Sequence, residues 1–223
     1  MKKFSALPNS KPKTVNKSKQ KSAGNVRIIG GQFKRRSLNF IDAEGLRPTP
    51  DRLRETLFNW LLADIHDARV LDSCAGSGVL GFESLSRGAQ HCTFIEANHH
   101  QSQVLQQSAQ QLQLDNSHYQ IIQGRAEHVL NDQCTQPFDI VFIDPPYAQD
   151  LWQPILAALV TQQLITADTL IYLEADKELS DQLHELALTL SASPESQPLL
   201  CFECIKKTKV GQVVAGLYRL TSS

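Results

Sequence analysis

Short apolar segments alternate with amphipathic segments through most of the chain. From residue 69 onward, five apolar runs predict strands over residues 69–73, 92–96, 119–123, 138–144 and 169–174. The segments between them carry apolar residues at helical spacing and predict helices, near residues 79–87, 98–113, 126–131 and 151–161. This alternation of strand and helix is typical of an α/β fold with a doubly wound, mostly parallel sheet.

The two ends of the chain follow a different pattern. Residues 199–206 and 213–220 flank the turn Val210-Gly211-Gln212 and predict a C-terminal antiparallel hairpin. Residues 26–29 and 33–40 surround Gly30-Gly31 and predict a smaller N-terminal hairpin.

A helix is predicted shortly after the N-terminal hairpin. Thr49 is expected to cap this helix, with Pro50 in its first turn. Apolar residues then recur at positions 53, 57, 60 and 61, which gives the helix one apolar face. The chain therefore divides into a basic tail (residues 1–25), an extension of hairpin plus helix (26–62) and an α/β domain (63–223).

Charge separates the same parts of the chain. The first 54 residues hold fourteen of the 22 basic residues but three of the 23 acidic ones, a net charge of +11, and the remainder carries −12. Residues 1–25 are rich in Lys, Ser, Asn and Pro and are expected to be disordered. A basic arm on an acidic body indicates a polyanionic partner, most simply nucleic acid, although a solubilising tail is the alternative.

Composition excludes several classes of protein. An apolar content of 41% allows a packed core, so a wholly disordered protein is excluded. No apolar run approaches the ~18 residues that cross a bilayer, and the N-terminus lacks the apolar core of a secretory signal. Five cysteines fit reduced thiols rather than a disulfide framework. A cytoplasmic protein is expected.

A glycine-rich turn follows the first strand of the α/β domain. In this turn, Gly76 and Gly78 lack a Cβ, so the backbone can approach a ligand closely. Glu96 ends the next apolar strand, 20 residues after Gly76, where an acid in dinucleotide-type folds accepts hydrogen bonds from ribose hydroxyls. Asp72 precedes the glycines, and its carboxylate could face an ammonium group.

Two ligands fit this turn. Two acids and flexible backbone suit a cationic nucleoside with an amino-acid tail, of which S-adenosylmethionine is an example. A nicotinamide dinucleotide is the alternative, because Gly76, Gly78 and Gly81 also match the spacing G-x-G-x-x-G. The glycines alone do not distinguish the two ligands.

A buried strand ends in Asp144-Pro145-Pro146-Tyr147. The two prolines fix φ and remove two amide donors, so the nearby carbonyl groups stay free to accept hydrogen bonds. The Asp144 carboxylate is a further acceptor, and the Tyr147 ring offers a surface on which a planar group can stack. This combination favours a site for an exocyclic amino group over a strand that merely stops at prolines.

Asp-Pro-Pro-Tyr after an apolar strand resembles the amino-methyltransferase motif of class I S-adenosylmethionine-dependent enzymes. Together with residues 27–31, 45–61 and 75–78, it resembles the bacterial small-subunit ribosomal RNA guanine-N2 methyltransferase D family, and residues 171–174 and 209–213 also fit. The likeness runs from about residue 26 to residue 220 and does not cover the Lys-rich segment before it. The family usually has Asn or Asp where this chain has Arg125.

The resemblance implies a Rossmann-like class I methyltransferase. Its activity would be methyl transfer from S-adenosylmethionine to the N2 amino group of one guanine in 16S ribosomal RNA. The substrate would be RNA within a small-subunit assembly particle. Neither a metal ion nor a membrane would take part.

The motifs and the resemblance together predict three sets of site residues. The catalytic set is Asp144, Pro145, Pro146 and Tyr147. The cofactor-binding set is Asp72, Ala75, Gly76, Ser77, Gly78, Glu96, Ala97, Arg125, Ala126 and Asp144. The set expected to contact RNA phosphates is Lys34, Arg35, Arg36, Arg47, Arg52 and Arg54, with a solvated surface charge or an ion pair as the alternative for each.

Other functions compete with this one. Enzymes that methylate amino groups of DNA usually carry a target-recognition domain, for which 223 residues leave little room. Enzymes that methylate protein glutamine resemble Asn-Pro-Pro-Tyr, whereas this chain has Asp144. A nucleic-acid-binding protein without catalysis is a third alternative, against which the intact Asp72, Glu96 and Asp144 argue.

Overall fold

The computed structural model describes residues 22–41, 48–146, 150–191 and 200–222. Within these ranges the chain forms a seven-stranded sheet with the order β5-β4-β3-β6-β7-β9-β8. Five neighbouring strands are parallel: β3 (Arg69–Asp72), β4 (His91–Glu96), β5 (Tyr119–Gln123), β6 (Ile140–Ile143) and β7 (Leu170–Ala175). The predicted doubly wound sheet is confirmed.

The C-terminal hairpin extends this sheet at one edge. Strand β9 (Val213–Ser222) pairs antiparallel with β7, and β8 (Leu200–Val210) pairs antiparallel with β9. The predicted hairpin is confirmed, and β8 is longer than expected because its pairing with β9 continues to Val210, directly before the turn at Gly211.

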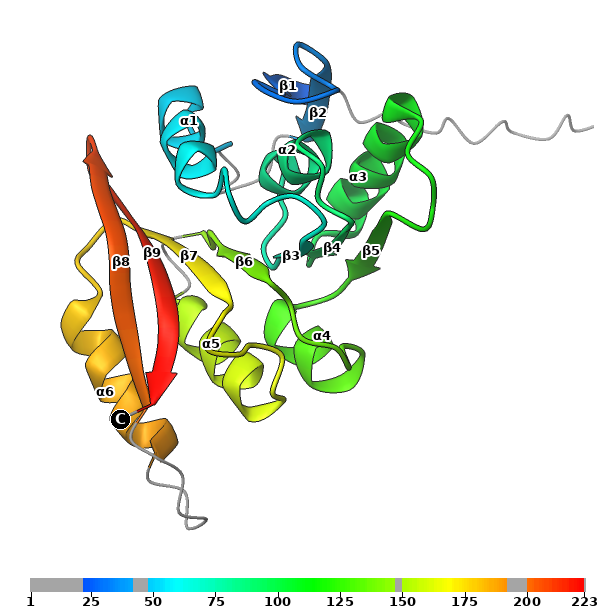
Figure 1. Cartoon of the computed structure of the whole chain (residues 1–223). Helices are drawn as coiled ribbons and strands as arrows, with labels where there is room; N and C mark the ends of the chain where they lie inside the picture. The colour runs from blue at the N-terminus through cyan, green and yellow to red at the C-terminus, as the bar shows by residue number, and fades with distance from the viewer. Residues whose placement is uncertain (1–21, 42–47, 147–149, 192–199, 223) are drawn as a thin grey trace, which may run out of the picture.

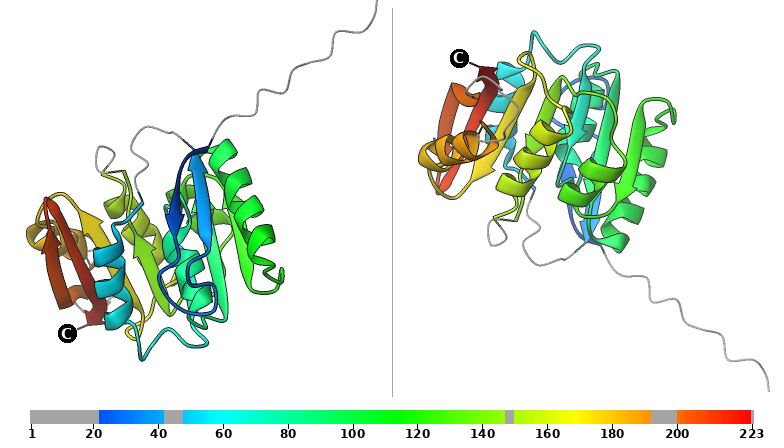
Figure 2. Two further views of the ribbon diagram at one scale, coloured as in Figure 1. Left: turned by 90° about the horizontal axis from the view of Figure 1, so that it is seen from above. Right: turned by 90° about the horizontal axis from the view of Figure 1, so that it is seen from below.

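Helices cover both faces of the sheet, as Figures 1 and 2 show. One face carries α1 (Asp51–Trp60), α2 (Val79–Ser86) and α3 (His99–Leu112). The other carries α4 (Ala126–Asp132), α5 (Trp152–Thr161) and α6 (Ser180–Ser191). None of the described helices is long and apolar enough to span a membrane.

Side chains of the central strands alternate between the two layers. Val70 and Phe142 pack into the core beneath α1, α2 and α3, whereas Leu71, Val141 and Ile143 pack into the core beneath α4 and α5. All four residues of β6 are buried, which explains why this strand is an unbroken apolar run rather than an alternating one.

The N-terminal hairpin differs in detail from its prediction. Strand β1 (Ser22–Arg27) pairs antiparallel with β2 (Ser37–Ile41), and residues 28–36 form the connection. The boundary of the tail, placed at residue 25, is therefore wrong, because residues 22–25 belong to β1. Pairing with β2, which no local apolar pattern reveals, makes this polar segment a strand. Residues 1–21 lie outside the described residues.

Candidate active site

Three acidic residues follow neighbouring parallel strands at the same edge of the sheet. Asp72 ends β3, Glu96 ends β4 and Asp144 follows β6 directly. Ser73 ties β3 to β6 at this edge, because its backbone N–H and its Oγ donate to the Phe142 carbonyl at 3.1 and 2.7 Å. The strand order reverses between β3 and β6, so this edge is where open α/β sheets bind ligands.

The glycine turn between β3 and α2 needs residues without side chains. Gly76 and Gly78 have φ angles of +51° and +73°, which other residues rarely adopt. A Cβ at Gly78 would lie 2.5 Å from Cδ2 of Leu105. The turn is also fixed in place, because the Gln101 amide donates to the Gly76 carbonyl at 2.7 Å and the Ala75 N–H donates to the Ile95 carbonyl at 2.9 Å. Ser77 is buried in this turn.

Asp72 is buried beneath the glycine turn, with 3% of its surface exposed. Its Oδ2 accepts a hydrogen bond from the Gly81 N–H at 3.0 Å. Burial, with a smaller contribution from the charge of Glu96, raises the pKa of Asp72 to about 7, although the bond from Gly81 opposes this rise. A bound cation would favour the ionised carboxylate.

Glu96 links the ends of β4 and the glycine turn. Its Oε2 accepts from the Gly76 N–H at 2.8 Å, and its Oε1 accepts from the Asn98 N–H at 2.7 Å. Burial raises the pKa of Glu96, and these backbone hydrogen bonds oppose that rise. Each carboxylate oxygen can accept more than one hydrogen bond, so the group retains capacity for hydroxyl donors.

Asp144 is held by a residue from the N-terminal extension. Thr49 Oγ1 donates to Oδ2 of Asp144 at 3.0 Å. The prediction that Thr49 caps the following helix is wrong: α1 begins at Asp51 without a side-chain cap, and the Thr49 hydroxyl is engaged by Asp144 instead. Burial and the nearby charge of Glu174 raise the pKa of Asp144 well above its usual range, whereas the Thr49 hydrogen bond lowers it.

Glu174 is a fourth acid at this edge, and it is not among the predicted site residues. It lies on β7 beside β6, it is buried, and the Tyr172 hydroxyl donates to its Oε2 at 2.9 Å. An acid near the end of an apolar strand, as in β4, is the signal that could have identified it. The side chain also lines a pocket beside the diproline segment, made by Pro145, Pro146, Asp150, Trp152, Glu174, Ala175, Asp176 and Lys177.

The catalytic motif is described only in part. Pro145 is buried and Pro146 is half-buried, and both line the pocket that contains Glu174. Tyr147 lies outside the described residues, so its stacking role stays a prediction.

The remaining residues of the predicted cofactor-binding set lie at the start of α4 and directly after β4. Ala126 is buried at the first position of that helix. The Arg125 side chain is 61% exposed and pairs with Glu127 at 2.6 Å, so the guanidinium is directed toward its own helix. Ala97 is exposed, and its carbonyl accepts from the Gln123 side chain at 3.3 Å.

Most of the predicted RNA-contacting residues that the structure describes are exposed. Lys34, Arg35 and Arg36 lie on the connection between β1 and β2, and Arg36 donates to the Gln111 carbonyl of α3. Arg52 is exposed on α1. Arg47 lies outside the described residues.

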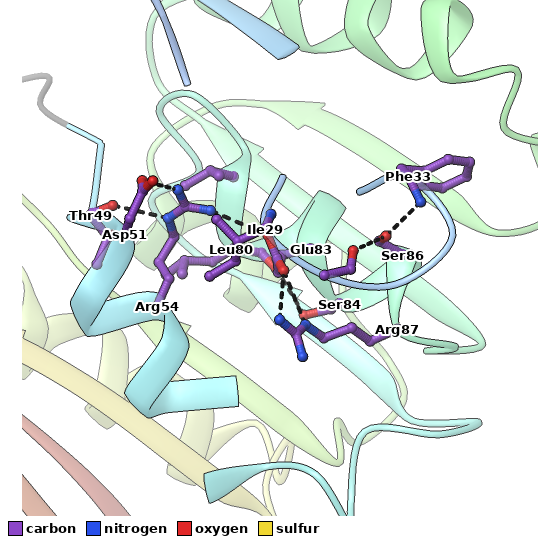
Figure 3. Close-up of polar contacts among 12 residues, drawn as sticks. Ile29, Phe33, Thr49, Asp51, Arg54, Leu80, Glu83, Ser84, Ser86 and Arg87 are labelled. Atoms are coloured by element: carbon purple, nitrogen blue, oxygen red, sulfur yellow. Dashed lines mark hydrogen bonds and ion pairs between the residues drawn. The ribbon is translucent and has the colours of Figure 1, made fainter. Parts of the chain in front are cut away.

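The structure contradicts the prediction that Arg54 contacts RNA phosphates. Its side chain is 0% exposed and lies 3.2 Å from Glu83 and 2.6 Å from Asp51. Figure 3 shows the Arg54 guanidinium between these partners. A guanidinium that is fully enclosed by the protein has no surface to offer a phosphate, so Arg54 is not an RNA contact. Its position one turn before Leu57, on the buried face of α1, is the signal that could have shown this.

The buried network around Arg54 joins three parts of the protein. Glu83 of α2 accepts from Arg54 of α1, from Arg87 at 2.9 Å, and from the Ile29 N–H of the N-terminal hairpin connection at 2.8 Å. Arg54 Nε donates to the Thr49 carbonyl at 3.1 Å. The network therefore fixes the extension, including Thr49, against the α/β domain (Figure 3).

Comparison with known proteins finds relatives that match most of the chain. The profile described as Conserved hypothetical protein 95 matches residues 26–218. Ribosomal RNA small subunit methyltransferase D of Haemophilus influenzae is 40% identical over 156 residues, which cover 70% of this chain and 81% of that protein.

Solved structures show the same fold. An Escherichia coli structure, titled provisionally as a methyltransferase, is 34% identical with a TM-score of 0.70 and covers 88% of this chain and 98% of its own. A structure titled provisionally as a methyltransferase complexed with SAH has a TM-score of 0.62 and covers 82% of this chain and 53% of its own. At 11% identity the latter shares the fold alone.

Proposed function

The chain belongs to the family described as Conserved hypothetical protein 95, and from this premise we propose that it methylates the N2 amino group of a guanine in 16S ribosomal RNA with S-adenosylmethionine as the methyl donor. The observation that carries the proposal is the Asp144 carboxylate, followed by two prolines, at the strand end next to the glycine turn of β3. The similarity to Ribosomal RNA small subunit methyltransferase D supports the class of RNA.

The residues around the glycine turn fit this cofactor. Asp72 is buried, and a positive charge beside it favours its ionised form, so its carboxylate suits the ammonium group of the cofactor. Glu96 has acceptor capacity for the ribose hydroxyls. The positive φ angles of Gly76 and Gly78 allow close backbone approach. When bound, S-adenosylmethionine supplies an electrophilic methyl group on a sulfonium.

Asp144 and the Pro145 carbonyl perform the catalytic work on the protein side. The amino lone pair of guanine is delocalised into the ring and is a poor nucleophile. Acceptors for the two amino hydrogens favour a pyramidal nitrogen and stabilise the positive charge that develops on it. No strong general base is needed, because the methylated ammonium is acidic and loses its proton readily.

The basic surface serves RNA binding in this proposal. Lys34, Arg35, Arg36 and Arg52 are exposed and would contact phosphates, together with Arg47. The guanine must leave its stack to reach Asp144, and stacking on Tyr147 would compensate for about 1–3 kcal/mol of that cost. The substrate would be 16S ribosomal RNA in a small-subunit assembly particle.

A comparison of substrates tests the proposal. The protein is incubated with radiolabelled S-adenosylmethionine and with 30S subunits, naked 16S RNA, DNA or a release factor. Label in small-subunit RNA is expected, whereas label in DNA or protein without label in RNA refutes it. Calorimetry with S-adenosylmethionine separates the enzyme from a pure binding module, which would show no heat of binding.

A further inference from the structure

Thr49 is buried where the N-terminal extension meets the carboxyl end of β6. Only 4% of its surface is exposed, and its hydroxyl donates to Oδ2 of Asp144 at 3.0 Å across 95 residues of sequence. The contact connects a segment outside the α/β domain with the residue that carries the proposed chemistry.

Thr49 is itself fixed by the buried network. The Arg54 guanidinium donates to the Thr49 carbonyl at 3.1 Å, and Arg54 is held 3.2 Å from Glu83, which is fully buried on α2 (Figure 3). Helix α2 follows the glycine turn directly. The buried network therefore sets the position of the Thr49 hydroxyl relative to the glycine turn and to Asp144.

The groups that face Asp144 come from several elements. Burial, and to a lesser extent the charges of Glu174 on β7 and Asp72 on β3, raise the pKa of Asp144. The Cys74 thiol lies close enough for the Asp144 charge to raise its pKa, although burial is the larger cause. The hydrogen bond from Thr49 acts in the opposite direction, because it stabilises the carboxylate form.

We infer that Thr49 is a positioning residue of the methyl-transfer site: its hydroxyl holds one oxygen of the Asp144 carboxylate and leaves the other oxygen to accept from the target amino group. Because this role depends on the proposed function, the test has one readout that needs activity and one that does not. The N-terminal extension would then complete the active site in addition to binding RNA.

The activity readout compares two substitutions at Thr49. Thr49→Val keeps the shape and removes the hydroxyl, and it should lower kcat about 10- to 100-fold, the effect of losing a hydrogen bond to a charged group, with KM for S-adenosylmethionine within about twofold. The acid limb of the kcat profile should move to higher pH, because Asp144 must be ionised to accept. Thr49→Ser should recover most of the loss and restore the profile.

A matched control separates this role from a general effect of replacing threonine. Thr56 lies on α1 and bonds to the Arg52 carbonyl of its own helix at 3.0 Å, so Thr56→Val should leave kcat and its pH profile unchanged. Equal effects of Thr49→Val and Thr56→Val would overturn the inference.

The second readout is the carboxyl ¹³C titration of Asp144 in the purified protein, assigned with Asp144→Asn. The midpoint should rise in Thr49→Val relative to the wild type. An unchanged midpoint overturns the inference whether or not the wild type methylates RNA. A raised midpoint in a protein that methylates no RNA supports the contact and refutes the proposed function alone.

Discussion

Replacing Glu83 by Gln tests the buried network that attaches the N-terminal extension. Glu83 is fully buried, and its two oxygens accept from Arg54, from Arg87 and from the Ile29 N–H. Glutamine has nearly the same volume, so the substitution removes the charge and one acceptor oxygen without opening a cavity. Arg54, which is 0% exposed, then loses its buried counter-charge and retains Asp51, whose side chain is 56% exposed.

The cost of this change follows from the burial of the pair. Removing one partner of a buried ion pair costs about 3–5 kcal/mol, because the remaining charge is left without compensation. Asp51 and the retained amide oxygen offset part of this, so we expect a loss of about 3 kcal/mol in the free energy of unfolding of Glu83→Gln. With a urea slope of about 2–3 kcal/mol per molar, the midpoint should fall by about 1 M.

Urea unfolding followed by circular dichroism measures this change. Glu55→Gln on the exposed face of α1 is the matched control, and its free energy of unfolding should stay within about 0.5 kcal/mol of the wild type. Replacing both partners, as in Arg54→Met with Glu83→Leu, should cost less than Glu83→Gln alone, because the fully buried Arg54 charge is removed together with its partner. Arg87 loses the same carboxylate in both variants, and its side chain is 20% exposed, so it can reach water. A loss below about 1 kcal/mol in Glu83→Gln, or an equal loss in the control, would refute this account of the network.

The remaining predictions concern the site itself. Asp144→Ala should abolish methyl transfer while calorimetry finds the affinity for S-adenosylmethionine within a few-fold of the wild type; equal loss of both would mean that Asp144 mainly binds the cofactor. The pKa of Asp72 rises from 3.8 to about 7 on folding, so between about pH 4 and 7 the folded state holds a proton that the unfolded state has lost, and stability falls as pH rises through that window. Asp72→Asn should remove part of this slope in urea unfolding at pH 5 and pH 8, and an unchanged slope would contradict the assignment. Gly78→Ala should weaken cofactor binding at least tenfold by calorimetry, because a Cβ there meets Leu105 and Phe82 and the φ of +73° is strained; an unchanged affinity would show that the turn can adjust. Deleting residues 1–21, which precede β1, should flatten the salt dependence of RNA affinity, because seven lysines are removed; an identical slope would show that the tail binds no phosphate.

The sequence predicts the α/β architecture because its signals are local. Each parallel strand is a short apolar run, and each following helix repeats its apolar residues at helical spacing, so β6 and α5 are both visible without knowledge of their partners. The predicted start of the first strand, residue 26, lies after the observed start of β1 at Ser22. The first residues of β1 are polar, and they form a strand because they pair with β2.

The parts of the site that were missed depend on contacts between distant segments. Thr49 reads as a helix cap from its position before Pro50, and its bond to Asp144 spans 95 residues. Arg54 reads as one more surface charge in a basic segment, and its burial depends on Glu83 from another helix. The glycine turn and the acids at the strand ends could be predicted from the sequence, because residues that directly follow parallel strands gather at one edge of the sheet.

Identification of the modified nucleoside tests the central claim most directly. Small-subunit RNA from a strain lacking the gene is incubated with the protein and S-adenosylmethionine, digested to nucleosides and analysed by mass spectrometry beside the same reaction with Asp144→Ala. The account predicts N2-methylguanosine in the wild-type reaction and none with the variant. A methyl group on adenine, on cytosine or on a ring carbon, or N2-methylguanosine formed equally by Asp144→Ala, would contradict it.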